Sequence, residues 1–249
     1  MQVLENKVAI VTGAGRGIGR AIALAYAKAG ASAVIVGRTA QTIEAVAAEI
    51  IALGGSALAV RADLAQDADI QRVIDVTLQR FGSIDLLVNN AGIIPPFVDL
   101  VDYDPRMWRE VININLTAPA LLIRGVLPDM IARRSGKIIN ISSIGGRNGG
   151  KGRSAYRASK AGLINLTQSV AAEVKVHGID VNCICPGGVD TEGLLESFGA
   201  ERLNKRDPLI KPEEIAELAL FLASPASSSI TGTSIDAFGL SNPIFRPLP

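Results

Sequence analysis

Short apolar runs alternate with amphipathic stretches along almost the whole chain. Seven runs have the length and apolar content of buried strands, at residues 7–11, 33–36, 57–60, 84–88, 137–141, 179–185 and 233–236. Between them, apolar side chains recur at helical spacing in residues 17–29, 42–53, 70–81, 108–133, 154–176 and 212–222. The pattern predicts strands that alternate with helices.

Such an alternation favours a parallel sheet, because neighbouring parallel strands need a crossover connection, which is usually a helix. The sequence contains no repeat of fixed period and no change of composition that would mark a linker. We therefore predict an α/β fold in one Rossmann-type domain, residues 1–249, with a doubly wound parallel seven-stranded sheet and helices on both faces. Residues 191–212 are expected to form a short substrate lid, a loop over the carboxyl ends of the strands.

The composition fits a compact intracellular chain. Hydrophobic residues make up 48% of the 249 residues and charged residues 20%, which is enough apolar material for a large core. The 25 Lys and Arg residues nearly balance the 24 Asp and Glu residues, so we expect no binding to nucleic acid or to an anionic membrane. The N-terminus carries no signal-peptide pattern and no apolar run reaches about 18 residues, so a cytoplasmic location is expected.

The two cysteines, Cys183 and Cys185, lie two residues apart in one apolar run. Neighbours on one strand face are poorly placed for a disulfide, so we expect buried, reduced thiols. Two cysteines are also too few for a structural zinc site, and no metal site is predicted.

A glycine-rich turn joins the first predicted strand to the first predicted helix. The turn contains Gly13, Gly15, Arg16, Gly17, Ile18 and Gly19. Glycines let the backbone approach a pyrophosphate closely, and the following helix offers free N–H groups and the positive end of its dipole. The spacing of Gly13, Gly17 and Gly19 departs from the strict G-x-G-x-x-G pattern. Within a complete α/β alternation, the turn nevertheless favours a nucleotide site.

The residues after the second strand indicate which dinucleotide binds. Roughly twenty residues beyond the glycine turn, NAD-binding proteins carry an Asp or Glu that accepts from the ribose hydroxyls. Here Gly37, Arg38 and Thr39 follow the strand, so no carboxylate repels a 2′-phosphate and Arg38 can bind it. Arg16 can add a second charge-assisted contact. We predict NADP(H) rather than NAD(H) as the cofactor.

Tyr156 and Lys160 lie four residues apart at the start of a predicted helix and therefore share a face. A phenol has a pKa of about 10, which a neighbouring ammonium lowers because it stabilises the phenolate. Ser142 and Ser143 end the preceding strand, and a glycine-rich loop leads from them to the Tyr156 helix. Strand ends and helix starts at the carboxyl edge of a sheet can converge on one pocket.

Several segments of the chain resemble the motifs of the short-chain dehydrogenase/reductase family. They are residues 12–19 (TGAGRGIG), 89–92 (NNAG), 112–115 (ININ, ending in Asn115), 141–143 (ISS), 156–160 (YRASK) and 186–191 (PGGVDT). They occur in the family's order and at its spacing over essentially the whole chain. The resemblance implies an NAD(P)(H)-dependent oxidoreductase that interconverts a carbonyl and a secondary alcohol, similar to 3-oxoacyl-[acyl-carrier-protein] reductases.

The resemblance also implies a role for each matching residue. Tyr156 would donate its proton to the substrate oxygen in reduction and accept it in oxidation. Lys160 would lower the phenol's pKa and bond the nicotinamide ribose, Ser143 would hold and polarise the carbonyl, and Asn115 would hold the backbone and a water that connect Lys160 to solvent. At the dinucleotide, the resemblance places Asp63 and Leu64 by the adenine, Asn89, Ala91 and Gly92 by the adenosine ribose, and Pro186, Gly187, Val189 and Thr191 by the nicotinamide, with Tyr156 and Lys160 beside it.

Two other classes of protein fit parts of the sequence. Residues 145–152 nearly match the phosphate loop of ATPases and GTPases, but Gly152 stands where the Ser or Thr that binds Mg²⁺ is needed. A dinucleotide-sensing protein without catalysis could dispense with Tyr156 or Lys160, whereas both are present. The family resemblance favours the enzyme over both alternatives.

The sequence leaves two substrate classes as alternatives: an acyl compound, or a polyol, sugar or cyclic alcohol. Arg133 and Arg134 resemble the basic patch that docks acyl carrier protein, but His177 stands where a second docking arginine is expected. Three further cations could attract an anionic substrate or could be solvated surface charges; they are Arg147, Lys151 and Arg153.

The predicted helices around Asn115 and Tyr156 carry small and apolar residues on more than one face. These include Ala158, Ala161, Gly162, Leu163 and Leu166. The helices thus carry more apolar surface than one face of the sheet can cover. This favours packing of helices between subunits, so we expect a homotetramer or dimer. However, residues 236–239 (DAFG) replace the Asp-Gly-Gly that often ends the family's last strand, which puts the usual C-terminal subunit contact in question.

Overall fold

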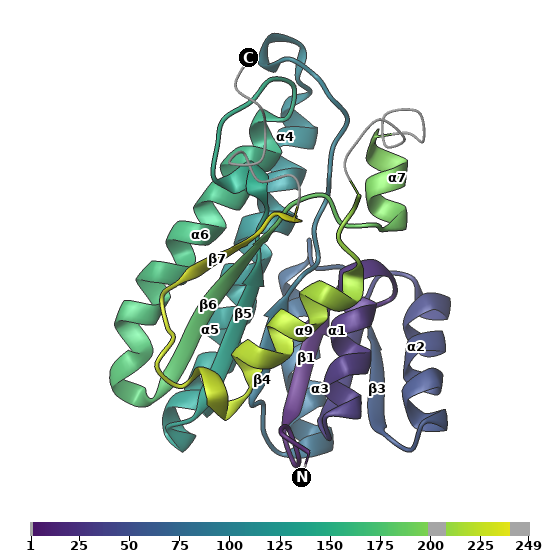
Figure 1. Cartoon of the computed structure of the whole chain (residues 1–249), viewed down its shortest axis with the longest axis vertical. Coiled ribbons are helices and arrows are strands. Elements are labelled where there is room, and N and C mark those ends of the chain that lie inside the picture. The colour runs from purple at the N-terminus through teal and green to yellow at the C-terminus, as the bar shows by residue number, and fades with distance from the viewer. Residues whose placement is uncertain (1, 199–207, 240–249) are drawn as a thin grey trace.

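The computed structural model describes residues 2–198 and 208–239, and there one seven-stranded parallel sheet lies between two layers of helices (Figure 1). Its order, β3-β2-β1-β4-β5-β6-β7, reverses between β1 and β4, which is where doubly wound sheets bind ligands. The strands are β1 (Val8–Thr12), β2 (Ser32–Gly37), β3 (Ser56–Arg61), β4 (Leu86–Asn89), β5 (Gly136–Ile141), β6 (Ile179–Pro186) and β7 (Ser234–Ala237). The predicted fold class is confirmed.

Each face of the sheet has its own apolar core. Helices α1, α2 and α9 cover one face, where Ile22, Ile43 and Ile215 are buried, and α3, α5 and α6 cover the other. The low aromatic content suits this packing, because Ala, Val and Ile let helices lie close to a parallel sheet. The helices are α1 (Gly17–Lys28), α2 (Ala40–Ala52), α3 (Asp67–Phe81), α4 (Pro105–Ile112), α5 (Ala118–Arg133), α6 (Ser154–Val174), α7 (Glu192–Phe198) and α9 (Pro212–Ala223).

The structure departs from the predicted elements in two places. The single helix expected at residues 108–133 begins earlier, at Pro105, and contains a π-helical turn at Asn113–Thr117 between α4 and α5. The loop expected at residues 191–212 contains the short helix α7, which stands above the carboxyl ends of the strands (Figure 1). Thr191 starts this helix, since its Oγ1 accepts from the Leu194 N–H. Residues 199–207 of the predicted lid lie outside the described part of the chain.

The continuous helical stretch Pro105–Arg133 is long and apolar enough to cross a membrane by length and composition, although no such stretch was expected. Within the fold, Leu122, Ile123, Val126 and Met130 of this stretch are buried in the core that α5 shares with the sheet. Its apolar side chains are therefore used in packing, as in the core helix of a globular domain.

A network of charged groups ties the end of α5 to the sheet. Arg133 donates from Nη1 to Asp85 Oδ1 (2.9 Å) and from Nη2 to Asp129 Oδ2 (2.8 Å), and Asp85 Oδ2 accepts from the Val8 N–H (2.9 Å). The side chain of Asp85 is only 8% exposed, so its charge depends on these partners. Arg133, half of the pair that resembles a docking patch, is thus engaged inside the fold.

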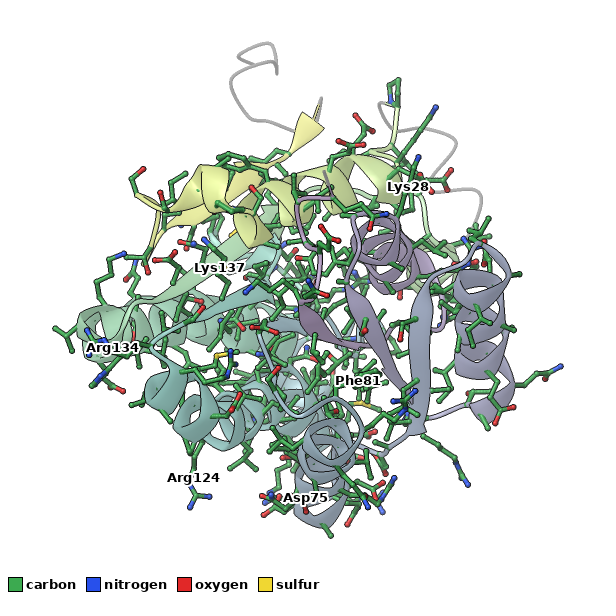
Figure 2. All side chains as sticks on the ribbon, turned by 90° about the horizontal axis from the view of Figure 1, so that it is seen from below. Lys28, Asp75, Phe81, Arg124, Arg134 and Lys137 are labelled. Atoms are coloured by element: carbon green, nitrogen blue, oxygen red, sulfur yellow. The ribbon has the colours of Figure 1, made fainter. Side chains whose placement is uncertain are left out.

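Removing the Arg133 guanidinium should destabilise the protein. Arg133→Met leaves Asp85 and Asp129 without their main cationic partner, and we expect a loss of about 3 kcal/mol in the free energy of unfolding, measured by urea denaturation. Arg124→Met on the same helix is the matched control, because Arg124 projects away from the fold (Figure 2), and it should change that free energy by less than about 0.5 kcal/mol. Equal effects of the two changes would contradict a structural role for Arg133.

Candidate active site

A cavity of about 550 Å³ opens at the carboxyl ends of the central strands. It lies at the position where the strand order reverses, and residues from the first turn, the ends of β4, β5 and β6, and the start of α6 line it. Ile18, Asn90 and Gly92 lie on its wall together with Pro186, Gly187, Val189 and Thr191. Ser143, Tyr156 and Lys160 line the same cavity, so three of the four predicted catalytic residues share one space with six of the other predicted cofactor residues, namely Ile18, Gly92, Pro186, Gly187, Val189 and Thr191.

The end of β5 and the start of α6 bring Ser143, Tyr156 and Lys160 together. The Ser143 side chain hydrogen-bonds the Tyr156 phenol, and its Oγ also accepts from the Gly145 N–H (3.0 Å). Lys160 Nζ lies 5.9 Å from the centroid of the Tyr156 ring. The neighbouring Ser142 points elsewhere, because its hydroxyl donates to the Lys160 backbone carbonyl (2.8 Å). Ser143, and not Ser142, is therefore the hydroxyl at the phenol.

The ammonium of Lys160 is held in a buried position. Lys160 is 4% exposed and donates from Nζ to the Ile141 carbonyl oxygen at the end of β5 (2.7 Å). Burial lowers the pKa of Lys160 to about 8. Burial raises the pKa of Tyr156, although the Ser143 side chain and the charges of Arg153 and Arg157 act in the opposite direction. The lowering of this pKa by Lys160 that the sequence predicted is therefore not found in the structure. At neutral pH the phenol is therefore protonated and the lysine is mostly charged.

Asn115 lies on the π-helical turn and is fully buried. Its Oδ1 accepts from the Ile93 N–H (2.7 Å), and its Nδ2 donates to the Ile93 carbonyl (3.0 Å) and to Ser159 Oγ (3.2 Å). A Cβ on Gly92 would lie 3.3 Å from Asn115 Oδ1 and 3.5 Å from Lys160 Nζ. The extra residue of the π-turn thus aims the amide at the backbone beside Lys160. Asn115 therefore holds the Ile93 backbone, and the predicted water path from Lys160 to solvent stays a prediction.

The glycines of the turn allow a backbone that side chains would strain or crowd, which a turn that binds pyrophosphate requires. Gly13 and Gly17 have φ of +63° and +54°, and a Cβ on Gly19 would lie 2.4 Å from the Gly13 carbonyl oxygen. Gly15 is similarly confined, with a Cβ that would lie 2.5 Å from Thr42 Oγ1. Helix α1 begins at Gly17 and directs its N-terminus towards this turn.

Thr12 and Asn90 join the glycine turn to the end of β4. Thr12 Oγ1 accepts from the N–H groups of Asn90 and Ala91 (both 3.0 Å), and Asn90 Nδ2 donates to the Thr12 carbonyl (2.9 Å). Asn89 has a different place: its Nδ2 donates to Asn140 Oδ1 (2.9 Å) inside the sheet, and Asn90 rather than Asn89 lines the cavity. The predicted place of Asn89 by the adenosine ribose stays a prediction.

The remaining predicted cofactor residues surround this turn. Arg38 follows β2 at the surface, while Arg16 forms a bidentate ion pair with Glu196 of α7, in which both side chains are more than half exposed. Asp63 follows β3 and accepts from the Ala65 N–H (3.1 Å), and Leu64 beside it is buried. These two residues do not line the cavity, and their predicted place by the adenine stays a prediction.

The basic residues of the glycine-rich loop occupy three different environments. Arg147 donates to Asp236 Oδ1 (2.7 Å), and Lys151, which is 85% exposed, lies 3.2 Å from Asp99. Lys151 therefore points to the surface, whereas the lysine of an ATPase or GTPase phosphate loop reaches the bound phosphates. Arg153, by contrast, lines the cavity. The sequence did not predict that Phe97 and Arg157 line the cavity as well, because their positions depend on the arrangement of loops.

Cys183 and Cys185 are free, buried thiols on β6, as predicted. Burial and the neighbouring Cys185 thiol raise the pKa of Cys183. They pack with Ile164 and Phe238 against the outer face of the sheet and do not line the cavity.

The chain resembles characterised oxidoreductases over nearly all of its length. It is 41% identical over 244 residues to a 3-oxoacyl-[acyl-carrier-protein] reductase of Synechocystis sp. (96% of this chain, 98% of the relative). It is 40% identical over 244 residues to the cis-4-hydroxycyclohexanecarboxylate dehydrogenase of Sinomonas cyclohexanicum (96% and 97%).

The fold matches solved structures equally well. A candidate NAD(P)-dependent gluconate 5-dehydrogenase of Beutenbergia cavernae, solved with NADP bound at low occupancy, superposes with a TM-score of 0.89 at 38% identity and covers 95% of this chain and 97% of its own. The short chain dehydrogenase family model matches residues 7–201. The chain therefore belongs to the short-chain dehydrogenase/reductase family and is an oxidoreductase that interconverts carbonyl and alcohol groups with a nicotinamide dinucleotide.

Proposed function

We propose that Tyr156 is the proton-transfer residue of an NADP(H)-preferring enzyme that acts on a small carbonyl or alcohol. The observation that carries this proposal is the position of the phenol, which bonds Ser143, lies near the buried ammonium of Lys160 and lines the cavity beside the glycine turn. A protein that only sensed a dinucleotide would not need this set of groups.

The bound nicotinamide supplies or accepts the hydride, and the protein supplies the proton. In reduction, the substrate oxygen accepts hydrogen bonds from Ser143 and Tyr156, and the phenol gives up its proton as negative charge develops there. Lys160 stabilises the resulting phenolate because its ammonium is close and water is largely excluded. With a pKa of about 8, Lys160 can also pass on a proton near neutral pH. Asn115 fixes the backbone beside Lys160 and so supports this path.

The preference for NADP(H) rests on charge at the outer end of the glycine turn. Arg38 follows β2 where NAD-binding proteins carry a carboxylate, and Arg16 lies within the turn. Glu196 pairs with Arg16 in the cofactor-free protein, but a pair so exposed contributes little and can be exchanged for a phosphate. Both guanidinium groups can therefore contact a 2′-phosphate.

A free small molecule suits the site better than a carrier-bound acyl chain. Arg133 is held by Asp85 and Asp129, and His177 replaces a second docking arginine, so little of the docking patch is available to an acidic carrier protein. We therefore place a free acyl compound first, because a relative 41% identical is a 3-oxoacyl-[acyl-carrier-protein] reductase. A polyol, sugar or cyclic alcohol comes second, because a relative 40% identical is a cis-4-hydroxycyclohexanecarboxylate dehydrogenase.

We further propose a cytoplasmic homodimer or homotetramer. On α6, Ala158 and Ala161 are exposed and small enough to let a second helix approach closely. Leu163, which was expected to contribute, is instead buried in its own subunit.

Tyr156→Phe should lower kcat at least a thousandfold, because the change removes the proton donor and leaves the ring in place. The Kd for NADPH, measured by fluorescence titration, should change less than threefold. Tyr103→Phe is the matched control: the Tyr103 hydroxyl is buried without a hydrogen-bond partner in the described structure, so its removal should leave kcat unchanged. Turnover by Tyr156→Phe at near the normal rate would remove the phenol from the mechanism.

Lysine Cε resonances should reveal the depressed pKa of Lys160. In protein labelled with ¹³C-lysine, one resonance should titrate with a midpoint near 8, and it should be missing in Lys160→Met. Since this pKa lies below that of the unfolded chain, about 10.4, the unfolded chain binds more protons between these values. The contribution of Lys160 to stability therefore rises with pH across that window. A protein in which every lysine titrates above pH 10 would contradict the burial of its charge.

Arg38→Ala should weaken NADPH binding at least tenfold and change NADH binding less than threefold, since only NADPH carries the 2′-phosphate. Calorimetric titration with each dinucleotide measures both constants. Arg20→Ala is the control, because Arg20 is paired with Glu49 between α1 and α2 and should affect neither dinucleotide. An equal loss for both dinucleotides, or tighter binding of NADH by the unmodified protein, would count against the NADP(H) preference.

A further inference from the structure

Arg157 follows Tyr156 directly on α6, and both residues line the cavity. The roles described above do not use this arginine. Its guanidinium is held by the loop between β5 and α6, because Nη1 donates to the carbonyl oxygens of Asn148 (2.7 Å) and Gly149 (3.2 Å). Gly150 leaves room for it, since a Cβ there would lie 2.5 Å from the guanidinium carbon. The side chain therefore has a fixed place beside the loop.

The same loop contacts the phenol ring and the backbone of the catalytic helix. A Cβ on Gly145 would lie 3.3 Å from Tyr156 Cε1, and a Cβ on Gly146 would lie 2.8 Å from the Lys160 carbonyl oxygen. The loop thus runs along the first turns of α6 and touches the tyrosine ring, the lysine backbone and the arginine guanidinium in succession. Arg157 and Tyr156 consequently lie against one short loop on one wall of the cavity.

The charge of Arg157 is not neutralised by a carboxylate. Within residues 2–198 and 208–239, Arg157 forms no ion pair, and its contacts are to neutral carbonyl groups. By contrast, Arg147 of the same loop is paired with Asp236 (2.7 Å). Lys151 lies 3.2 Å from Asp99. Among the described residues that line the cavity, none is an aspartate or glutamate. A cation without a counter-charge favours a negative charge that develops near it.

A cation at this point does not help the helix that carries it. The first turn of a helix lies at the positive end of the helix dipole, where acidic side chains are favourable and cations are not. The first turn of α6 contains no acidic residue, and Arg157 directly follows it. A phenolate on Tyr156, however, is favoured by the helix dipole and by the guanidinium alike. Departures from a local charge preference are expected where a function requires them.

Several titratable or charged groups surround the phenol. Besides Arg157 they are Lys160 and Arg153 of α6 and its start, Tyr103 of the segment before α4, and, next to Lys160, Cys183 and Cys185 of β6. Lys160 has a pKa of about 8 and loses its charge above that pH, whereas a guanidinium stays charged throughout. The arginines are therefore the cations that remain near the phenol at alkaline pH.

Arg157 is the arginine whose charge can be examined by itself. Arg153 is buried, its guanidinium stacks 3.9 Å from the centroid of the Phe97 ring, and its Nη2 donates to the Ser197 carbonyl of α7 (3.0 Å). Replacing Arg153 would therefore disturb the packing of α7 as well as the charge. The contacts of Arg157 are confined to the loop that lies on its own helix.

We propose that Arg157 is a positioning residue that keeps a permanent positive charge beside the Tyr156 phenol and stabilises its ionised form during proton transfer. This inference rests on the proposed function, since it concerns the same phenol. In reduction, the phenol O–H bond breaks, the proton passes to the substrate oxygen, and the electron pair of the bond stays on the phenolate oxygen. Arg157 exchanges no proton in this step. It lowers the cost of the negative charge, and it continues to do so above pH 8, where Lys160 is neutral.

A titration of Tyr156 in the full-length protein tests this inference without requiring turnover. The three tyrosines of the chain are replaced by 3,5-difluorotyrosine, whose phenol ionises closer to neutral pH, and ¹⁹F NMR follows each ring. The resonance of Tyr156 is the one that is missing in Tyr156→Phe. Arg157→Gln should raise the pKa of this phenol by about half a unit or more, because a nearby positive charge is lost. Arg157→Lys keeps the charge and should leave the pKa within about 0.3 of its value in the unmodified protein.

Lys151→Gln is the matched control, because it removes a cation of the same loop whose side chain is 85% exposed and does not line the cavity. It should change the pKa of Tyr156 by less than about 0.2. An unchanged pKa in Arg157→Gln would overturn the inference. An equal rise in Arg157→Gln and Arg157→Lys would overturn it too, because the arginine would then act only by holding the loop.

The pH dependence of turnover separates this inference from the proposed function. In the NADP⁺-dependent oxidation of cyclohexanol, kcat/KM should rise with pH through the pKa of Tyr156, because the base must be ionised to accept the proton of the alcohol. Arg157→Gln should move the midpoint of this rise upwards by as much as it moves the titration. A shift of the titration without a shift of the pH profile would reject Tyr156 as the base and leave the charge beside the phenol intact. Activity that depends on Tyr156, with neither quantity moved by Arg157→Gln, would reject the inference and leave the proposed function intact.

Discussion

The site depends on keeping a positive charge at Lys160 where little water can reach it. Burial works against the ammonium, which is why its pKa falls to about 8, and the Ile141 carbonyl at the end of β5 offsets part of that cost. The proposed stabilisation of the neighbouring phenolate by this ammonium depends on the same exclusion of water. Three parts of the fold hold Lys160 in this position. The end of β5 supplies the Ile141 carbonyl, α6 carries the side chains of both Tyr156 and Lys160, and Asn115 fixes the backbone of Ile93.

The sheet serves this arrangement through buried polar contacts between its strand ends. Asn89 donates to Asn140, and Asn140 donates to Thr167 of α6, so a chain of side-chain hydrogen bonds joins β4 and β5 to the catalytic helix. Thr12 and Asn90 join β1 to β4 in the same way. Buried amides and hydroxyls that are paired with one another specify one alignment of the strand ends. Ile18 at the start of α1 and the predicted catalytic side chains of Ser143, Tyr156 and Lys160 consequently line a single cavity.

The sequence predicted the elements that have strong local patterns. The alternation of apolar runs and helical periods gave the parallel sheet, and the motif residues converge at the carboxyl edge because all parallel strands end there. It did not predict the π-turn at Asn115, which has no local signature, or helix α7, whose Thr191 cap lies in a segment with few apolar residues. Asn89 and Asn90 could not be distinguished either, because neighbouring residues on a strand point to opposite faces and only the register decides which one meets the cavity. Likewise, Lys151 and Arg153 have similar sequence environments, and only the position of Phe97 and α7 separates an exposed charge from a buried one.

The most direct test of the central claim is a crystal structure of the full chain with NADPH. The account predicts that Lys160 Nζ and Tyr156 Oη both lie within about 3.5 Å of the nicotinamide ribose hydroxyls, with the phenol facing the open part of the cavity. The proposed proton-transfer role of Tyr156 would be contradicted if the phenol pointed away from the nicotinamide and Lys160 stayed hydrogen-bonded to the Ile141 carbonyl, far from the ribose.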